Sequence, residues 1–322
     1  MKPKNILILS VVLLLVVVGF MAGDFFFSKG PNQENPYEYD LTNQKEIDPS
    51  LICYEELPAI KPETDYLYGI AIDNNNNLYV SGTEKLFIYS SVGQLISTIP
   101  LKDNAYCLTV APSGNIYLGM SEHVEVWNKD GVQLQSWPSI SDSSIFTSIA
   151  VNETSVFVAD AGKKTVYHFN LNGELQNKIG EKDTGNGKLG FILPSAYFDL
   201  LIGRNNELWA VNPGIHQLES YRPNGEMIAS WQRTSMQLDG FSGCCNPSHI
   251  AMLSDGSFVT SEKGIERVKI HRPTGDFECV VAGPDQFIAG TTDLDLAVDT
   301  KDRIYVSDPK KGLVRIFEKI NK

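Results

Sequence analysis

An internal repeat constrains this chain more than any other feature of its sequence. An apolar stretch, a turn that carries Asp, Asn or Gly, and a second apolar stretch recur six times between residues 69 and 306. The six copies read GIAIDNNNNLYV, CLTVAPSGNIYL, SIAVNETSVFV, DLLIGRNNELWAV, HIAMLSDGSFV and DLAVDTKDRIYV. A third apolar stretch follows every copy, and a fourth follows every copy except the last. Because short apolar stretches bounded by turn residues are typical of strands, a complete unit predicts four strands.

The number of units and their spacing predict the fold. Equivalent positions in the second stretch are Tyr79, Tyr117, Phe157, Trp209, Val259 and Tyr305. They are separated by 38, 40, 52, 50 and 46 residues, and such units of four short strands are typical of a β-propeller. The sixth unit lacks its own fourth strand, so we expect the strand at residues 51–60 to supply it and close the ring. The sequence therefore predicts an all-β, six-bladed β-propeller over residues 51–322.

The units resemble NHL repeats. SIAVNETSVFVADAGKKTVYHF and LAVDTKDRIYVSDPKKGLVRIF are good copies of the NHL pattern, whereas the unit that contains Trp209 departs from it. The stretch from Gly243 to Pro284, which contains GCCNP, SEKG and RVKI in that order, is similar to a bacterial subgroup of NHL-repeat proteins. The resemblance implies a six-bladed, TolB-like propeller from about residue 51 onward. It implies no particular activity.

The N-terminus carries an apolar segment. Residues 6–22 have no charge, and 13 of these 17 residues are Ile, Leu, Val or Phe, a composition that favours insertion into a membrane. With Lys2 and Lys4 on the cytoplasmic side, residues 1–23 predict a single-pass transmembrane signal anchor and residues 24–50 a tether. The alternative is a cleaved secretory signal. Both interpretations place the propeller outside the cytoplasm, for example in the periplasm.

The charge balance limits the classes of partner. The chain has 27 Lys and Arg residues against 39 Asp and Glu residues, which gives a formal net charge of −12. Nucleic-acid binding needs a clustered basic surface, so we expect no nucleic-acid partner. Membrane contact is expected only through residues 6–22.

The propeller topology brings the starts of the six inner strands to one mouth of the central channel. The residues at these positions are Gly69, Cys107, Ser148, Asp199, His249 and Asp295. Because carboxylate and imidazole groups are common metal ligands, Asp199, His249 and Asp295 form a candidate site for a divalent metal. Cys107 is a further channel candidate. The alternative is that these residues solvate a water-filled channel or cap neighbouring loops.

The second strands end at the same face of the predicted ring. Their last residues are Asp160, Asn212, Glu262 and Asp308. The NHL resemblance implies that most of these side chains are structural and accept loop N–H groups. Glu262 and Lys263 replace the usual Ala-Asp pair, so we treat them as ligand candidates. Glu266, Arg267 and Lys269 are expected to be charges on the blade surface.

The five cysteines leave several pairings open. They are Cys53, Cys107, Cys244, Cys245 and Cys279. Because the number is odd, at least one thiol stays free or pairs between chains. Cys244 and Cys245 can form a vicinal disulfide, bind a soft metal, or pair separately with Cys279 or Cys53. We expect a structural disulfide among these residues, because an exported domain permits one.

Motif content and loop lengths favour a binding protein over an enzyme. The sequence has no Gly-x-Ser-x-Gly, His-Glu-x-x-His or phosphate-binding loop. The loops at residues 180–194, 231–247 and 283–293 are longer than the others and are expected on one face. We expect this face to bind a protein, peptide or glycan as a binding or scaffolding module. The alternative is a metal-dependent enzyme or redox accessory protein with its site at the channel mouth.

Overall fold

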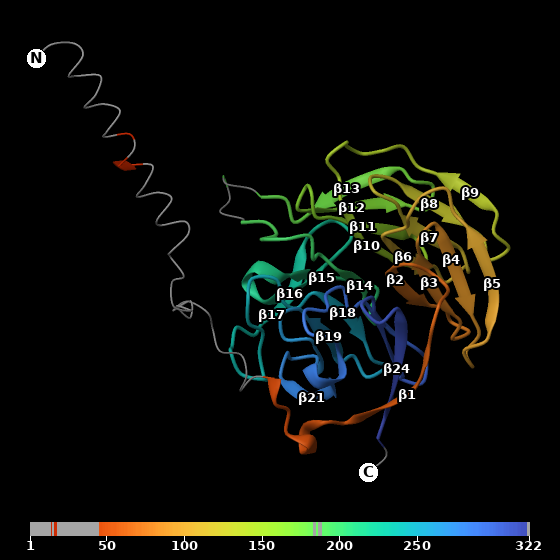
Figure 1. The fold of residues 1–322 in the computed structure, drawn as a ribbon. Helices are drawn as coiled ribbons and strands as arrows, with labels where there is room; N and C mark the ends of the chain where they lie inside the picture. Colours follow the sequence, from red (N-terminus) through yellow and green to blue (C-terminus); the bar gives the residue numbers. More distant parts are fainter. Residues whose placement is uncertain (1–13, 15, 18–44, 183–184, 186–188, 321–322) are drawn as a thin grey trace, which may run out of the picture. The chain divides into compact units, whose positions relative to one another are not determined.

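A computed structural model shows an all-β, six-bladed β-propeller (Figure 1). It describes residues 14, 16–17, 45–182, 185 and 189–320. Within these residues, 24 strands form six four-stranded antiparallel sheets, which are the blades. The all-β fold and the six blades predicted from the repeat are confirmed.

Each of the first five blades consists of four consecutive strands, ordered from the centre of the ring outward. Blade 1 contains β2 (Leu67–Ile72), β3 (Leu78–Gly82), β4 (Lys85–Tyr89) and β5 (Leu95–Pro100). Blade 2 contains β6 (Cys107–Val110), β7 (Ile116–Gly119), β8 (Val124–Trp127) and β9 (Gln133–Ser136). Blade 3 contains β10 (Phe146–Val151), β11 (Ser155–Asp160), β12 (Thr165–Asn170) and β13 (Leu175–Ile179).

The remaining blades complete the ring. Blade 4 contains β14 (Leu200–Ile202), β15 (Leu208–Asn212), β16 (Gln217–Tyr221) and β17 (Met227–Gln232). Blade 5 contains β18 (His249–Met252), β19 (Phe258–Glu262), β20 (Arg267–His271) and β21 (Phe277–Ala282). Blade 6 contains β22 (Leu296–Val298), β23 (Ile304–Asp308), β24 (Leu313–Lys319) and β1 (Tyr54–Ile60). Short 3₁₀ turns occur at η1 (Pro49–Leu51), η2 (Pro213–Ile215) and η3 (Pro284–Gln286).

The glycine in the turn before the fourth strand lets neighbouring blades pack closely. Gly173 and Gly275 have φ values of +82° and +84°, in the left-handed region that favours glycine. Gly173 lies against the indole ring of Trp137, and Gly275 lies against that of Trp231. Each tryptophan is at the outer edge of the preceding blade. A Cβ atom at either glycine would lie 2.6 Å from the indole ring. The repeated glycine therefore serves both the turn and the packing between blades.

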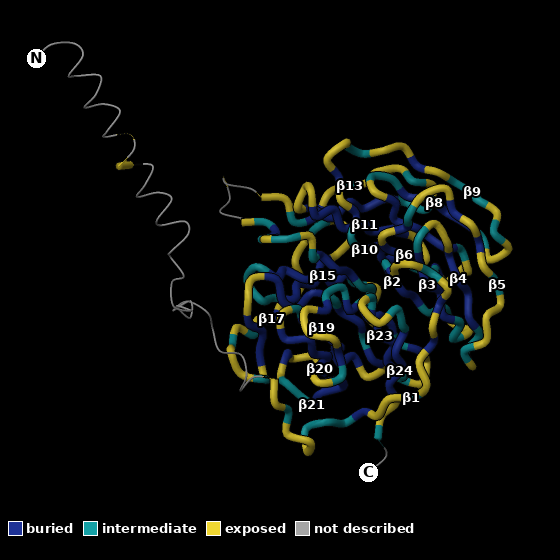
Figure 2. Tube along the Cα trace, viewed as in Figure 1, coloured by how far each residue is buried: buried dark blue, intermediate teal, exposed yellow. Residues whose placement is uncertain are grey.

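The core consists of apolar clusters that join adjacent blades. The buried residues appear in dark blue in Figure 2. Phe146, Phe157, Phe198 and Phe258 are almost completely buried in these clusters. Burial of such a side chain contributes about 1.5–3 kcal/mol. The outermost strands are more exposed, as in β5 and β17. Each blade therefore depends on its neighbours for most of its apolar contacts.

The segment expected to close the ring is strand β1. It pairs antiparallel with β24, and the register places Tyr54 opposite Lys319 and Leu57 opposite Ile316. Figure 1 shows the early strand β1 beside the late strand β24. The two ends of the propeller sequence thus share one blade. Their pairing completes the sixth sheet and closes the ring.

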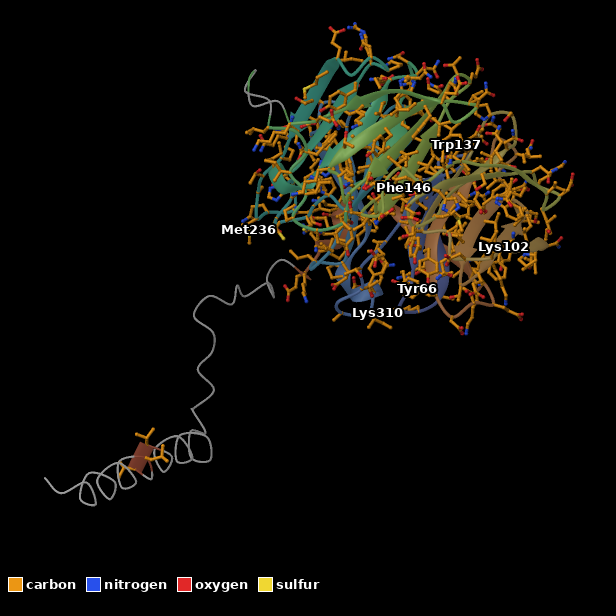
Figure 3. All side chains as sticks on the ribbon, turned by 90° about the horizontal axis from the view of Figure 1, so that it is seen from above. Tyr66, Lys102, Trp137, Phe146, Met236 and Lys310 are labelled. Atoms are coloured by element: carbon orange, nitrogen blue, oxygen red, sulfur yellow. A yellow bond between two sulfur atoms is a disulfide. The ribbon has the colours of Figure 1, made fainter. Side chains whose placement is uncertain are left out.

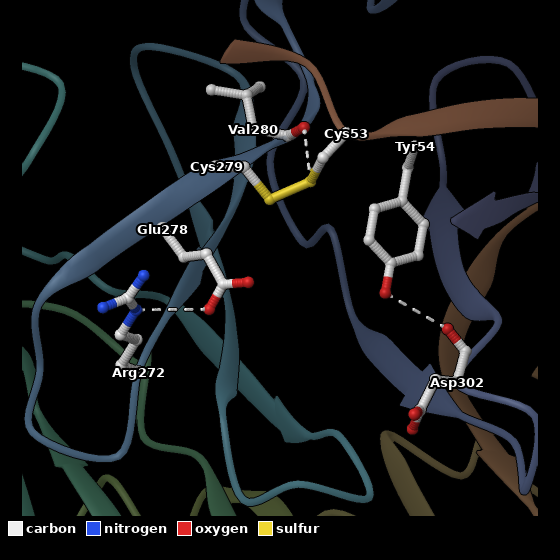
Figure 4. The surroundings of a disulfide bond; sticks show 7 residues. All are labelled: Cys53, Tyr54, Arg272, Glu278, Cys279, Val280 and Asp302. Atoms are coloured by element: carbon white, nitrogen blue, oxygen red, sulfur yellow. Dashed lines mark hydrogen bonds and ion pairs between the residues drawn. A yellow bond between two sulfur atoms is a disulfide. The ribbon is translucent and has the colours of Figure 1, made fainter. Parts of the chain in front are cut away.

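A disulfide reinforces this closure (Figure 4). Cys53, immediately before β1, is bonded to Cys279 in β21, with a Cα–Cα distance of 6.0 Å. The adjacent Ile52 forms a parallel bridge with Val280, so the same segment also lies on the edge of blade 5. The disulfide links residues 226 positions apart and fastens the closing strand of blade 6 to blade 5. It settles one of the pairings that the sequence left open.

The chain divides by its internal contacts into two units, Met1–Leu41 and Thr42–Lys322. The first unit lies almost entirely outside the described residues, and so do most of the predicted anchor and most of the predicted tether. Among the residues that are described, no helix is both long and apolar enough to span a membrane.

We predict that Cys53→Ser lowers the free energy of unfolding by about 2–5 kcal/mol, because it releases a long loop in the unfolded chain. Denaturant unfolding under non-reducing conditions measures the change. Cys244→Ser removes an exposed free thiol and serves as the control, with an expected change within about 0.5 kcal/mol. Equal stability of Cys53→Ser and the unmodified protein would contradict a role of the disulfide in ring closure.

Candidate functional site

A cavity of about 800 Å³ occupies the central channel. All six inner strands, β2, β6, β10, β14, β18 and β22, contribute to its wall. Phe146, labelled in Figure 3, is one of the buried residues that line it. Because this space is built from every blade, its shape is fixed by the whole ring, as a preformed binding site requires.

Tyrosines line the cavity within or just before three of the inner strands. Tyr66 and Tyr68 have ring centroids 5.0 Å apart, and Tyr68 and Tyr106 have centroids 5.3 Å apart in an edge-to-face arrangement. Tyr66 and Tyr106 are 39% and 42% exposed. Tyr197 precedes blade 4, and its ring lies edge-on to His249 at 6.2 Å. The cavity therefore offers several aromatic faces to a ligand.

Asp199, His249 and Asp295 also come together in this cavity. One ligand atom from each residue lies within 4.8 Å of the others. His249 Nδ1 is 3.8 Å from Asp199 Oδ2 and 3.5 Å from Asp295 Oδ1. The three residues belong to blades 4, 5 and 6, and the ring brings them together as the repeat predicts.

Both carboxylates also connect neighbouring blades. Asp199 accepts a hydrogen bond from Leu200 N–H on its own blade and one from Ile250 N–H, at 2.8 Å, on blade 5. Asp295 does the same with Leu296 N–H and with Ile70 N–H of blade 1, the latter at 2.7 Å. Both carboxylates therefore cap backbone N–H groups, which is the structural role that the sequence left open. Each carboxylate oxygen has a further lone pair for a ligand.

Burial and charge set the protonation of the channel groups. Burial raises the pKa of Asp295 to about 6, His249 opposes the rise, and the negative charge of Asp199 adds to it. His249 Nε2 is buried and has no hydrogen-bond partner among the described residues. A cation near the two carboxylates would relieve their mutual repulsion, and a ligand atom near Nε2 would satisfy that nitrogen.

Cys107 lines the cavity, but its sulfur atom packs against Gly119 of its own blade. It is buried in the core cluster between blades 2 and 3, and a Cβ atom at Gly119 would lie 2.3 Å from its Sγ. Burial raises the pKa of the Cys107 thiol, and the charges of Asp295 and Asp199 add to the rise. The raised pKa favours the protonated thiol, which is a weaker metal ligand than a thiolate.

Glu262 lies in a buried ion-pair network inside blade 5. Its carboxylate is 2.6 Å from Arg267 Nε and 3.1 Å from Lys269 Nζ. Burial alone would raise the pKa of Glu262, but Lys269 and Arg267 outweigh that effect and hold it below its usual range. Burial lowers the pKa of Lys269 to about 8, and Glu262 opposes this change.

The expectation that Glu266, Arg267 and Lys269 are blade-surface charges is wrong. All three are at least 98% buried, because the long loops on both sides cover the third strand of blade 5. Lys269 Nζ donates to Gly240 O at 2.6 Å, within the 231–247 loop. Glu266 accepts the N–H of Gly290, within the 283–293 loop. These charged groups hold the long loops on the propeller.

The other second-strand ends have the structural role implied by the repeat pattern. Asp160 Oδ1 accepts the N–H groups of Ile145 and Lys163 at 3.0 Å. Asn212 Oδ1 accepts Ile192 N–H, and Asp308 Oδ1 accepts Lys311 N–H. These contacts anchor loops on the face that carries the channel mouth.

Lys263 lies beside Tyr197, a residue that lines the cavity. Its Nζ is 4.5 Å from the centroid of the Tyr197 ring and 3.4 Å from Ser195 Oγ. Ser195 in turn contacts Cys245. The sequence analysis selected Lys263 but missed Ser195 and the tyrosines. A signal was present, because a tyrosine stands one to three residues before the inner-strand positions Gly69, Cys107 and Asp199.

Comparison with solved structures supports the fold. Virginiamycin B lyase from Staphylococcus aureus aligns with a TM-score of 0.54 and 13% identity, over 84% of this chain and 89% of the lyase. A catalytically inactive histidine-to-alanine form of that lyase with quinupristin gives a TM-score of 0.55 and 10% identity, over 83% and 100% of the two chains. A protein of unknown function from Bacteroides thetaiotaomicron gives 0.58 and 14%, over 82% and 71%. Neither the protein-family models nor the curated protein sequences give a match.

We predict that Glu262→Gln lowers the free energy of unfolding by about 3–5 kcal/mol, because it leaves two buried cations beside a neutral amide. Denaturant unfolding measures the loss. The matched control is Glu226→Gln, whose ion pair with Arg222 is exposed, and here we expect a change below about 1 kcal/mol. Similar effects of the two substitutions would contradict a supporting role of the buried network.

Proposed function

We propose that this protein is a membrane-anchored, extracytoplasmic propeller of NHL-like repeats that binds a protein or peptide segment at its channel mouth. The segment carries a cationic side chain, which enters the central cavity. The N-terminal apolar segment supports the anchor, and the Cys53–Cys279 disulfide supports an oxidising compartment. Among the ligand classes expected from the sequence, a cationic peptide fits this cavity better than a neutral glycan.

The observation that carries this proposal is the pairing of aromatic faces with buried carboxylates. Tyr66, Tyr68 and Tyr106 offer ring faces that attract a cation, and Asp199 and Asp295 supply negative charge within the same cavity. The contact of Lys263 with the Tyr197 ring is an internal example of an ammonium group on an aromatic face. A Lys or Arg side chain also has an apolar stem that the channel walls can cover.

The long loops extend this site beyond the cavity. The loop at 231–247 leads directly into His249, and the loop at 283–293 ends two residues before Asp295. Part of the loop at 180–194 lies outside the described residues, but Ile192 is fixed to Asn212. We expect the described parts of these loops to contact residues on either side of the inserted side chain.

We predict that a labelled peptide with a central lysine binds more tightly than the same peptide with glutamine, measured by fluorescence anisotropy. Tyr106→Ala removes one aromatic face and is expected to weaken lysine-peptide binding by about 2- to 30-fold. Val92→Ala changes an exposed side chain in a turn of blade 1 and is the control, with unchanged binding expected. Equal affinity for the two peptides, or binding to glycans alone, would contradict the proposal.

The same residues support a second candidate function, a metal-dependent enzyme. Asp199, His249 and Asp295 supply two carboxylates and one imidazole within 4.8 Å, a donor set that suits divalent ions such as Zn²⁺ or Mn²⁺. The unpartnered Nε2 of His249 favours a further ligand in the site. A metal there would polarise a carbonyl or activate water, and Asp295 and Asp199 would hold it between blades.

We predict that a divalent metal, if it is the native ligand, binds at about one equivalent per chain and is lost in His249→Ala. Elemental mass spectrometry of protein purified without chelator or nickel measures it. His216→Ala, in the η2 turn away from the channel strands, should retain the metal. Metal-free protein that still binds the lysine peptide would rule out the enzyme candidate and keep the binding module.

A further inference from the structure

A second cluster of reactive side chains lies in the 231–247 loop, outside the channel. Cys244 and Cys245 are both free thiols, and their sulfur atoms are 3.3 Å apart. Cys244 is exposed, whereas Cys245 is only 1% exposed. One sulfur is thus open to a reagent from solvent, and the other lies directly behind it.

The surroundings of the pair are polar and include a cation. Ser195 Oγ lies 2.7 Å from Cys245 Sγ, and Lys263 Nζ lies 3.4 Å from the same Ser195 oxygen. The hydrogen bond with Cys245 raises the pKa of Cys244, and the positive charge of Lys263 acts against that rise. Because the pKa of Cys244 is raised, its thiolate fraction grows with pH, and reaction at Cys244 should accelerate with rising pH.

The covalent geometry of adjacent cysteines makes a bond between them reversible. Consecutive Cα atoms are about 3.8 Å apart across a trans peptide, which is shorter than the usual range of about 4.4–6.8 Å for disulfides. A disulfide with such a short separation is strained and readily reduced. The Cys53–Cys279 pair, with its Cα atoms 6.0 Å apart, lies within the usual range and is suited to a structural role.

We propose that Cys244 and Cys245 form a thiol–disulfide exchange site, in which Cys244 attacks an incoming disulfide and Cys245 resolves the mixed product. The Cys244 thiolate bonds to one sulfur of the incoming disulfide, and the other sulfur leaves as a thiolate. Cys245 then attacks the Cys244 sulfur and releases the second thiolate. The protein pair loses two protons and two electrons, and the incoming disulfide is reduced to two thiols. This activity does not depend on the proposed peptide binding.

The substrate is a sterically accessible disulfide. Only Cys244 is open to solvent, so the incoming group has to expose its sulfur at the surface of the 231–247 loop. Met236 of the same loop, labelled in Figure 3, is also exposed and lies at the margin of the propeller. A small-molecule disulfide and an exposed protein disulfide share this chemistry. The relative rates at which they react with Cys244 show which of them is the substrate.

To test this proposal, the full-length protein in mild detergent is treated with glutathione disulfide. Free thiols are then blocked by alkylation, and the products are identified by intact mass and peptide mapping. Glutathione disulfide is used in excess and without added thiol, because released glutathione would reduce the strained Cys244–Cys245 disulfide again. Under these conditions the unmodified protein should lose two alkylatable thiols and retain no glutathione. Cys245→Ser should trap one glutathione per chain on Cys244, because the resolving sulfur is missing. Cys244→Ser should react at least about 10-fold more slowly.

Two further measurements keep the test decisive. Cys107→Ala changes a thiol in a blade core and should react like the unmodified protein, with circular dichroism as the check on folding. An oxidised Cys-x-x-Cys protein replaces glutathione disulfide in a second arm, and a faster reaction there assigns a protein substrate. Stable glutathione adducts on the unmodified protein, wild-type rates in Cys244→Ser, or no reaction in either arm would overturn the proposal.

Discussion

Closure of the ring is the constraint on which the rest of this structure depends. Each blade buries its apolar faces against two neighbours, so a break between blades 5 and 6 would expose both faces at the break. The pairing of β1 with β24 completes blade 6, and the Cys53–Cys279 disulfide fastens that blade to blade 5. Because the cavity is lined by all six inner strands, the same closure also fixes the channel site.

The channel carboxylates have a structural role that is compatible with the proposed binding role. Asp199 and Asp295 each join two blades through backbone N–H groups, and these bonds hold the oxygens in place. The preorganised oxygens lie beside His249, and burial raises the pKa of Asp295. Two acidic groups held close in a buried channel favour a cation, whether it is an ammonium group or a metal ion. The surrounding tyrosines favour the ammonium group.

Much of the fold, but only part of the site, could be predicted from the sequence. The repeat fixes the number of blades, and the shared topology of the units brings Asp199, His249 and Asp295 together despite their separation in sequence. The direction of an individual side chain depends on packing that the repeat does not encode. The sulfur of Cys107 packs against Gly119. Lys269 is covered by the 231–247 loop, which joins blades 4 and 5. The pairing of Cys53 with Cys279 depends on the path of the segment before β1, which composition alone does not determine.

In the proposed complex, the cationic group of a ligand enters the tyrosine-lined channel. Hydrogen–deuterium exchange of the protein with and without a lysine peptide locates the binding directly. We expect added protection in the segments that line the cavity, residues 66–72, 106–109 and 196–202. Protection confined to the outer strands β5, β9, β13 and β17, with no change in the channel segments, would contradict the claim.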